Sequence, residues 1–175
     1  MNTRALGGSI PGPTLKLLPG DTLKITFNNK LQKQDGVETR NNYFRLPDSS
    51  NLHTHGLHTS PIRPGDDVTL LIEPGASFNY VFKIPADHMP GTHWLHTHLH
   101  GSAAIQVGGG ASMALIVEDP AKSLPTDIES AKDVLMVIHR FQLKDLGAIA
   151  DKSQDKRFNY TTSKGDIHYL VNGLN

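Results

Sequence analysis

The chain has 175 residues, a length typical of a single domain, and its charge is balanced, with 17 Lys and Arg against 17 Asp and Glu. This balance gives no electrostatic reason to expect nucleic acid or an anionic membrane surface as a partner, and no apolar run approaches the ~20 residues of a membrane span. Cysteine is absent, which excludes disulfides, thiolate chemistry and a cysteine-ligated blue-copper site within this chain.

Short strands separated by turns are expected along most of the chain. Sixteen glycines and eleven prolines divide the sequence into short segments. The strand-like segments are residues 14–18, 22–28, 68–73, 78–84 and 113–118. Residues 78–84 and 22–27 alternate apolar and polar residues, which is typical of half-buried strands. Helical periodicity is sparse, with room for one or two turns in 121–132 and in 144–152. The pattern predicts an all-β sandwich or barrel.

A domain boundary is expected after the strand that ends at Val117. Proline, serine and charged residues accumulate over 121–132, and a new strand-like run begins at Asp133. About forty residues are too few for an independent core. We therefore expect one domain over residues 1–120, a linker over 121–132 and the truncated start of a second domain over 133–175.

Two clusters of histidines carry the chemistry. Seven of the ten histidines lie in two short windows, and within these windows several alternate along a strand. Side chains two residues apart on a strand share a face, and imidazole is the commonest protein ligand of copper and zinc. Two such strands side by side would bring several ring nitrogens to one centre. We predict metal ligation by His53, His55, His96 and His98.

Other residues near the clusters are secondary candidates. His100 would lie on the same face of the strand as His96 and His98, and it is an additional candidate ligand. Gly101 suggests, however, that the strand ends there. His58 is expected at the rim of the site, as a further candidate. Asp66 and Asp67 follow a Pro-Gly turn, and either carboxylate could relay protons to the first histidine pair.

The remaining histidines are expected to have structural roles. His93 has the opposite parity to His96 and is expected to pack, whereas Trp94 is expected to form an apolar wall beside the metal. His88, His139 and His168 are expected to be loop or strand residues without a metal.

Ligation by histidine without thiolate fits copper, zinc, nickel or non-haem iron. A zinc ion could activate water for hydrolysis, and a copper cluster could activate dioxygen. A cupin would need a glutamate soon after the second cluster, where residues 102–104 are Ser-Ala-Ala. An amidohydrolase barrel needs ~250 residues with alternating helices. This chain has 175 residues and little helical periodicity. A metallo-β-lactamase-like hydrolase needs an aspartate that the segment 96–100 lacks.

The two clusters, in this order, resemble those of the N-terminal cupredoxin domain of a multicopper oxidase, of the laccase and bilirubin-oxidase group. Residues 53–56 resemble the family's first copper motif, HxHG, and residues 91–98 its second, GTxWYHxH. Residues 8–22 are similar to its opening NGxxPGPTxxxxxGD, and residues 108–117 resemble the strand that ends the domain. The resemblance covers most of residues 7–119 and implies a cupredoxin-like Greek-key β-sandwich or barrel.

The resemblance also implies a cofactor and roles for the histidines. His53 would bind a type 2 copper, and His55, His96 and His98 would bind a type 3 pair. These residues would be half of the histidine ligands of a trinuclear copper centre that reduces dioxygen to water. Asp66 or Asp67 would assist proton delivery. No type 1 copper site can form in this chain, because the family builds it around a cysteine.

The chain departs from the family pattern in its extent. The HCHxxxH motif of the C-terminal domain is absent, and the strand that precedes PGPT in the family is expected to be missing. We therefore expect the chain to be inactive alone, with the other ligands supplied by a C-terminal cupredoxin domain or another subunit. The alternative is a non-catalytic copper- or zinc-binding half-site that works through self-association or a partner subunit. Members of this family are commonly exported, so the resemblance implies a periplasmic or secreted protein.

Overall fold

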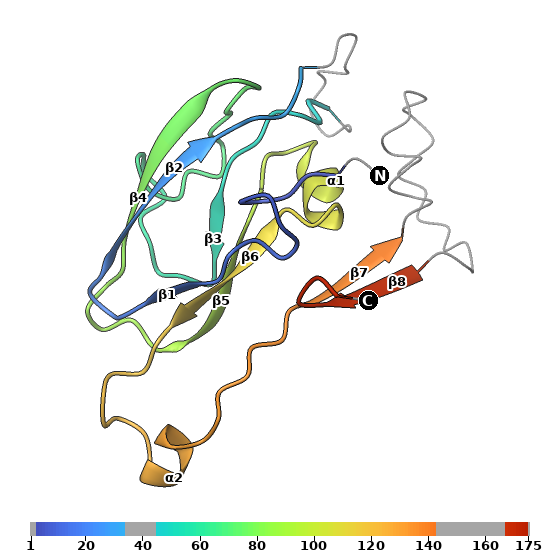
Figure 1. The fold of residues 1–175 in the computed structure, drawn as a ribbon. Helices are drawn as coiled ribbons and strands as arrows, with labels where there is room; N and C mark the ends of the chain where they lie inside the picture. The colour runs from blue at the N-terminus through green and yellow to red at the C-terminus, as the bar shows by residue number, and fades with distance from the viewer. Residues whose placement is uncertain (1–2, 34–44, 143–166, 175) are drawn as a thin grey trace.

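The computed structural model describes residues 3–33, 45–142 and 167–174. The helical turn expected within 144–152 lies outside these residues. Figure 1 shows the elements in chain order. They are β1 (Leu15–Leu17), β2 (Thr22–Asn28), β3 (His53–His55), β4 (Ser77–Lys83), β5 (Gly91–His96), α1 (Ala103–Gly108), β6 (Ser112–Val117), α2 (Thr126–Glu129), β7 (Ile138–Gln142) and β8 (Ile167–Val171).

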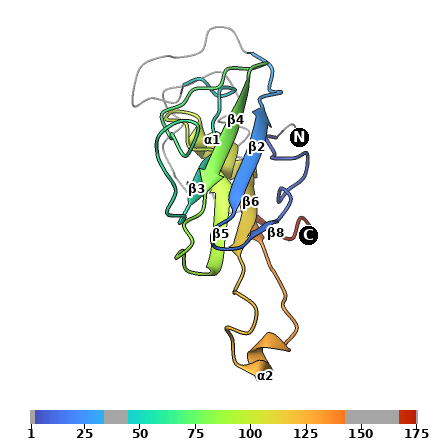
Figure 2. The ribbon, with the colours of Figure 1, turned by 90° about the vertical axis from the view of Figure 1, so that its left-hand side faces the viewer.

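Two sheets form a sandwich. One sheet has the strand order β1-β6-β5-β3, and the other consists of β2 and β4. The β1–β6 pair is parallel, and the β2–β4, β3–β5 and β5–β6 pairs are antiparallel. In Figure 2 the β2–β4 pair lies in front of β3, β5 and β6. The predicted all-β class is therefore confirmed.

Alternating side chains fill the space between the sheets. On the smaller sheet, Ile25 lies opposite Tyr80, and both residues belong to the core side. On the larger sheet, Leu95 and Leu115 are fully buried. The Tyr80 and Phe82 rings stack with their centroids 5.3 Å apart. The interior is thus apolar and aromatic, and it leaves the opposite face of β3 and β5 free for polar residues.

The strands predicted at the positions of β1, β2, β4 and β6 are confirmed. The strand predicted over 68–73 is wrong. This segment makes a single isolated bridge, between Ser50 and Ile72. Side chains take the hydrogen-bonding groups that a ladder would use, because Asp67 accepts from the Thr69 N–H and Asn51 donates to the Val68 carbonyl. The helix α1 was not predicted, whereas α2 falls within the 121–132 segment.

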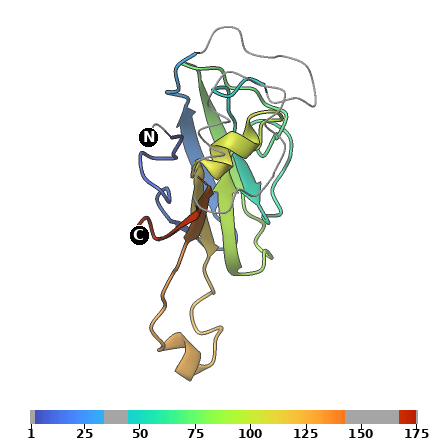
Figure 3. The ribbon, with the colours of Figure 1, turned by 90° about the vertical axis from the view of Figure 1, so that its right-hand side faces the viewer.

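The chain leaves the sandwich after β6, passes through α2 and returns as the β7–β8 hairpin (Figure 3). This hairpin contacts the sandwich, because Nε2 of His139 lies 3.0 Å from Oγ of Ser112 on β6. Gly173, with φ +81°, lies against the Ile10 carbonyl, where a side chain would not fit. Neither helix in the described part of the chain is long and apolar enough to cross a membrane.

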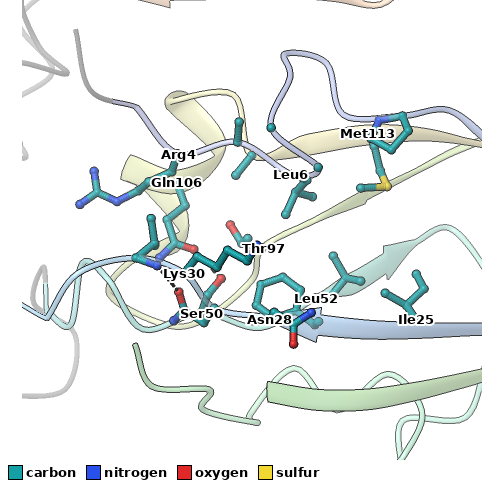
Figure 4. Close-up of a pocket in the computed structure, with 18 of the residues that line it drawn as sticks. Arg4, Leu6, Ile25, Asn28, Lys30, Ser50, Leu52, Thr97, Gln106 and Met113 are labelled. Carbon is teal, nitrogen blue, oxygen red and sulfur yellow. Dashed lines mark hydrogen bonds between the residues drawn. The ribbon is translucent and has the colours of Figure 1, made fainter. Parts of the chain in front are cut away.

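A cavity of about 900 Å³ opens beside β2, toward the N-terminal segment. Figure 4 shows Leu6, Ile25, Leu52 and Met113 among its mostly apolar lining. Thr97 lines the same cavity, so the residue between His96 and His98 belongs to the interior side of the chain. The Thr97 Oγ1 is buried and has no hydrogen-bond partner in the described residues.

Candidate metal centre

The two histidine motifs lie on neighbouring strands. β3 and β5 are antiparallel, with His53 opposite His96 and His55 opposite Trp94. These four side chains share one face of the sheet, because each strand places alternate residues on the same side. Leu95, which alternates with them, is completely buried in the core. The sandwich core therefore fixes the face on which the histidines meet.

Three of the predicted ligands form a cluster that could hold a metal ion. His53, His55 and His96 each offer a ring nitrogen, and these atoms all lie within 4.8 Å of one another. Nδ1 of His55 is 3.2 Å from Nε2 of His96. The ring of His98 adjoins this cluster, with its centroid 4.9 Å from that of His53. The structure thus brings all four predicted residues together around the end of β5.

Hydrogen bonds determine which nitrogen of two rings is available. Nδ1 of His53 lies 2.9 Å from Oδ2 of Asp66, and Nδ1 of His96 lies 2.9 Å from the Thr97 carbonyl oxygen. Both partners are acceptors, so each Nδ1 carries the proton and each Nε2 carries a lone pair. In the metal-free cluster the lone pair of His96 faces Nδ1 of His55. A carboxylate or carbonyl behind the imidazole is the usual support of a metal-binding histidine.

His96 and His98 are suited to binding a metal at neutral pH. Burial lowers the pKa of His96 and of His98, and the neighbouring His53 lowers both further. Neutral imidazole is the form that binds a metal. Nδ1 of His98 is buried without a hydrogen-bond partner among the described residues. These features fit the donor set of a copper site without thiolate.

The two candidate carboxylates have different surroundings. Asp66 is 8% exposed and accepts hydrogen bonds from the ring of His53 and from the backbone N–H and hydroxyl of Thr54. Asp67 instead binds Nε of Arg63 at 2.6 Å and the N–H and hydroxyl of Thr69. Hydrogen bonds from Thr69 and Arg63 lower the pKa of Asp67 to about 2. Asp66 therefore contacts the cluster through His53, whereas Asp67 bonds to Arg63 and Thr69 within its own loop.

Trp94 covers one side of the cluster, as expected from its parity. Its ring stacks on that of His96 with centroids 4.0 Å apart, and it lies 5.0 Å from the ring of His55. A large apolar ring in this position restricts the access of water to the buried His96, whereas His55 stays exposed. The Trp94 ring also holds the orientation of both imidazoles by packing.

A second group of histidines lies away from this cluster. The ring of His88 is 5.1 Å from that of His58 and 5.4 Å from that of His93. His88 is 5% exposed, and both of its nitrogens are used, because Nε2 accepts the His58 N–H and Nδ1 donates to the Met89 carbonyl. The structure therefore groups His58 with His88, and it places the exposed His100 6.1 Å from His98 by ring centroids.

Two residues that support the first motif were not predicted. The hydroxyl of Tyr80 accepts the backbone N–H of Leu52 at 3.0 Å, just before β3, and burial raises the pKa of Tyr80 to about 12. Asn51 is completely buried and accepts the backbone N–H of His98. Both contacts join residues far apart in the sequence, so no local pattern indicates them.

The structure is a β-sandwich of mixed strand direction that carries clustered histidines on two adjacent strands. The family model described as multicopper oxidase matches residues 2–122. The chain therefore belongs to the multicopper oxidase family. Its fold is the cupredoxin-like β-sandwich, and its relatives are oxidoreductases that bind copper and use dioxygen.

Curated relatives come from bacteria and fungi. The multicopper oxidase MmcO of Mycobacterium tuberculosis is 28% identical over 130 residues, which cover 74% of this chain and 21% of the relative. The multicopper oxidase mco of Staphylococcus haemolyticus is 29% identical over 175 residues, which cover 99% of this chain and 34% of the relative. The chain thus spans between a fifth and about a third of the length of these two relatives.

Solved structures agree with this fold. A multicopper oxidase from Campylobacter jejuni, described as a metallo-oxidase, is 29% identical with a TM-score of 0.52, over 65% of this chain and 21% of that chain. Fet3p, described as a multicopper oxidase that functions in iron import, has a TM-score of 0.63 over 96% of this chain and 28% of that chain. At 18% identity, the second likeness shows the fold alone.

Proposed function

We propose that this chain supplies half of the histidine ligands of the trinuclear copper centre in a laccase-type multicopper oxidase. In this proposal His53 binds the type 2 copper, and His55, His96 and His98 bind the type 3 pair. The observation that carries the proposal is the convergence of ring nitrogens from His53, His55 and His96 within 4.8 Å. When bound, such a copper cluster supplies the redox chemistry that reduces dioxygen to water.

The surrounding residues prepare the ligands for this role. Asp66 fixes the tautomer of His53, so that Nε2 is directed away from the carboxylate and available to a metal. The same carboxylate lies next to the cluster and is the proposed relay for protons. Trp94 packs against the rings of His55 and His96, and of these two His96 is buried.

The proposal requires ligands from outside this chain. The sequence contains no cysteine for a type 1 copper, and the chain covers 34% of the length of the staphylococcal relative. A C-terminal cupredoxin domain or another subunit therefore provides the remaining histidines and the electron-donating copper. Export to the periplasm or secretion is proposed from the resemblance to laccases.

Copper retention by the 175-residue chain tests the proposal. The chain is loaded with copper and dialysed, and the retained metal is measured by mass spectrometry beside a His96→Ala/His98→Ala double variant. His168→Ala, which removes an exposed histidine of β8, is the matched control. We expect the wild type and the control to retain copper and the double variant to lose it.

Three results would contradict parts of this proposal. Equal copper retention by the double variant would refute the ligand assignment. Oxidation of a phenolic dye by the chain alone at ordinary laccase rates would refute the requirement for a second half. Retained copper together with a concentration-dependent dimer, and no activity with any completing chain, would favour the non-catalytic module instead.

A further inference from the structure

Asn51 and His98 occupy opposite positions just beyond the end of a strand pair. The ladder between β3 and β5 begins where His53 pairs with His96. One step of two residues outward on both strands reaches Asn51 and His98. There Oδ1 of Asn51 accepts the backbone N–H of His98 at 2.7 Å. A side-chain amide thus provides the hydrogen bond to the second motif where the backbone ladder has stopped.

The other end of the same amide binds the loop that carries Asp66. Nδ2 of Asn51 donates to the Val68 carbonyl at 2.8 Å. Val68 lies two residues after Asp66, whose carboxylate holds the ring of His53. Asn51 has no exposed surface, so both hydrogen bonds are protected from competing water.

His98 depends on this contact more than the other rings do. The rings of His53 and His96 are held by their own Nδ1 hydrogen bonds, to Asp66 and to the Thr97 carbonyl. Nδ1 of His98 has no partner in the described part of the chain, and the residue lies beyond the end of β5. The hydrogen bond that fixes His98 therefore acts on its backbone, and its ring is placed by that backbone and by packing against the rings of His53 and His96.

We infer that Asn51 is a positioning residue that fixes His98 against His53 and ties both to the Asp66 loop. This inference rests on the proposed function, in which His98 is a copper ligand. Asn51 is not one of the proposed ligands, since its side-chain amide is engaged by His98 and Val68. It acts by holding the His98 backbone, and removal of the amide would leave the His98 N–H and the Val68 carbonyl without this partner.

A matched pair of asparagines allows a sharp test. Asn29 is also buried, and its Nδ2 bridges two carbonyls, those of Asp48 and Ile72, at 2.7 and 2.9 Å. Copper affinity is measured by chelator competition for Asn51→Ala and Asn29→Ala, alone and combined with His98→Ala. Thermal unfolding of every variant is measured in parallel.

We expect Asn51→Ala to weaken copper binding roughly 10- to 100-fold, in the range found for residues that support metal ligands. Asn29→Ala, at a comparable loss of stability, should leave the affinity unchanged. In the His98→Ala background, Asn51→Ala should have little further effect, because its contribution passes through His98. Asn51→Asp retains the acceptor for the His98 N–H and should bind copper more tightly than Asn51→Ala.

The alternative outcomes separate the two proposals. Equal losses of copper affinity in Asn51→Ala and Asn29→Ala would overturn the positioning role alone. The same holds if Asn51→Ala lowers the copper affinity as much in the His98→Ala background as in the wild type. A wild-type chain that binds no copper, or a His98→Ala variant with unchanged affinity, would overturn the proposed function and with it the role of Asn51.

Amide hydrogen exchange of the wild type is a further measurement that needs no variant. Protection of the His98 amide equal to that of the β5 amides is expected, and exchange at the rate of a free loop would refute the inference.

Discussion

Nδ1 of His53 and Oδ2 of Asp66 lie 2.9 Å apart, and the same carboxylate also accepts the backbone N–H and the hydroxyl of Thr54. One buried carboxylate therefore holds both the ring of a proposed ligand and the strand that carries it. Asp67, the next residue, makes none of these contacts. This contrast provides a direct comparison between two adjacent aspartates.

Asp66→Asn is expected to weaken copper binding by roughly 10- to 100-fold, because the amide cannot support the His53 imidazole as a carboxylate does. Asp67→Asn is the control, and it should leave copper affinity unchanged. Isothermal titration of both variants checks the prediction. If the two substitutions had the same effect on affinity, Asp66 would have no particular role at the site.

The loop of Asp67 should become less stable in acid. The folded pKa of Asp67 is about 2, below its ordinary value of 3.8. The carboxylate therefore stabilises the fold fully above about pH 4, and this contribution is lost as the pH falls toward 2. Urea unfolding of wild type and Asp67→Asn is expected to differ most at pH 5 and least near pH 2. A difference that does not change over this range would contradict the assignment.

His139 should make the docking of the β7–β8 hairpin sensitive to pH. Burial lowers the pKa of His139 below its ordinary value of 6.5, so folding favours the neutral ring. Its stabilising contribution is complete above about pH 6.5 and declines as the pH falls below that value. His139→Gln is expected to reduce the loss of stability between pH 8 and pH 5. His168→Gln, at an exposed position of β8, is the control and should behave as wild type.

Gly56 allows the chain to turn directly after the first histidine pair. Its φ is +91°, and an added Cβ would lie 2.7 Å from Nδ1 of His93. Gly75 has a similar φ of +84°, but an added Cβ there meets no atom within 4 Å. Gly75→Ala is expected to lose about 1–2 kcal/mol of stability from backbone strain alone, and Gly56→Ala should lose more. Equal losses in chemical denaturation would show that His93 moves aside freely.

Much of the fold and site follows from the two-residue period of strands. Alternation places His53 and His55 on one face and sends Leu95 to the opposite side, and it separates His93 from His96. The period does not choose the partner strand or its register, because these depend on contacts between distant segments. The pairing of His53 with His96 is therefore visible only in the structure.

The failures of sequence reasoning involve side chains that replace backbone contacts. The apolar segment 68–73 has the composition of a strand, yet Asn51 and Asp67 occupy backbone groups within it. Asp66 and Asp67 are indistinguishable in sequence, since both follow the same turn. Their different roles depend on which carboxylate the turn directs toward His53.

The short pairing of β3 with β5 has a consequence for the order of folding events. β3 has three residues, so few backbone hydrogen bonds define its register. A slip of one residue would exchange faces, and Thr54 rather than His53 would lie beside His96. Hydroxyl and imidazole differ greatly in their affinity for copper, so the metal would bind tightly only to chains in the native register. Because a ligand stabilises the form that it binds, copper bound as proposed would favour folded molecules in which β3 and β5 pair in the native register.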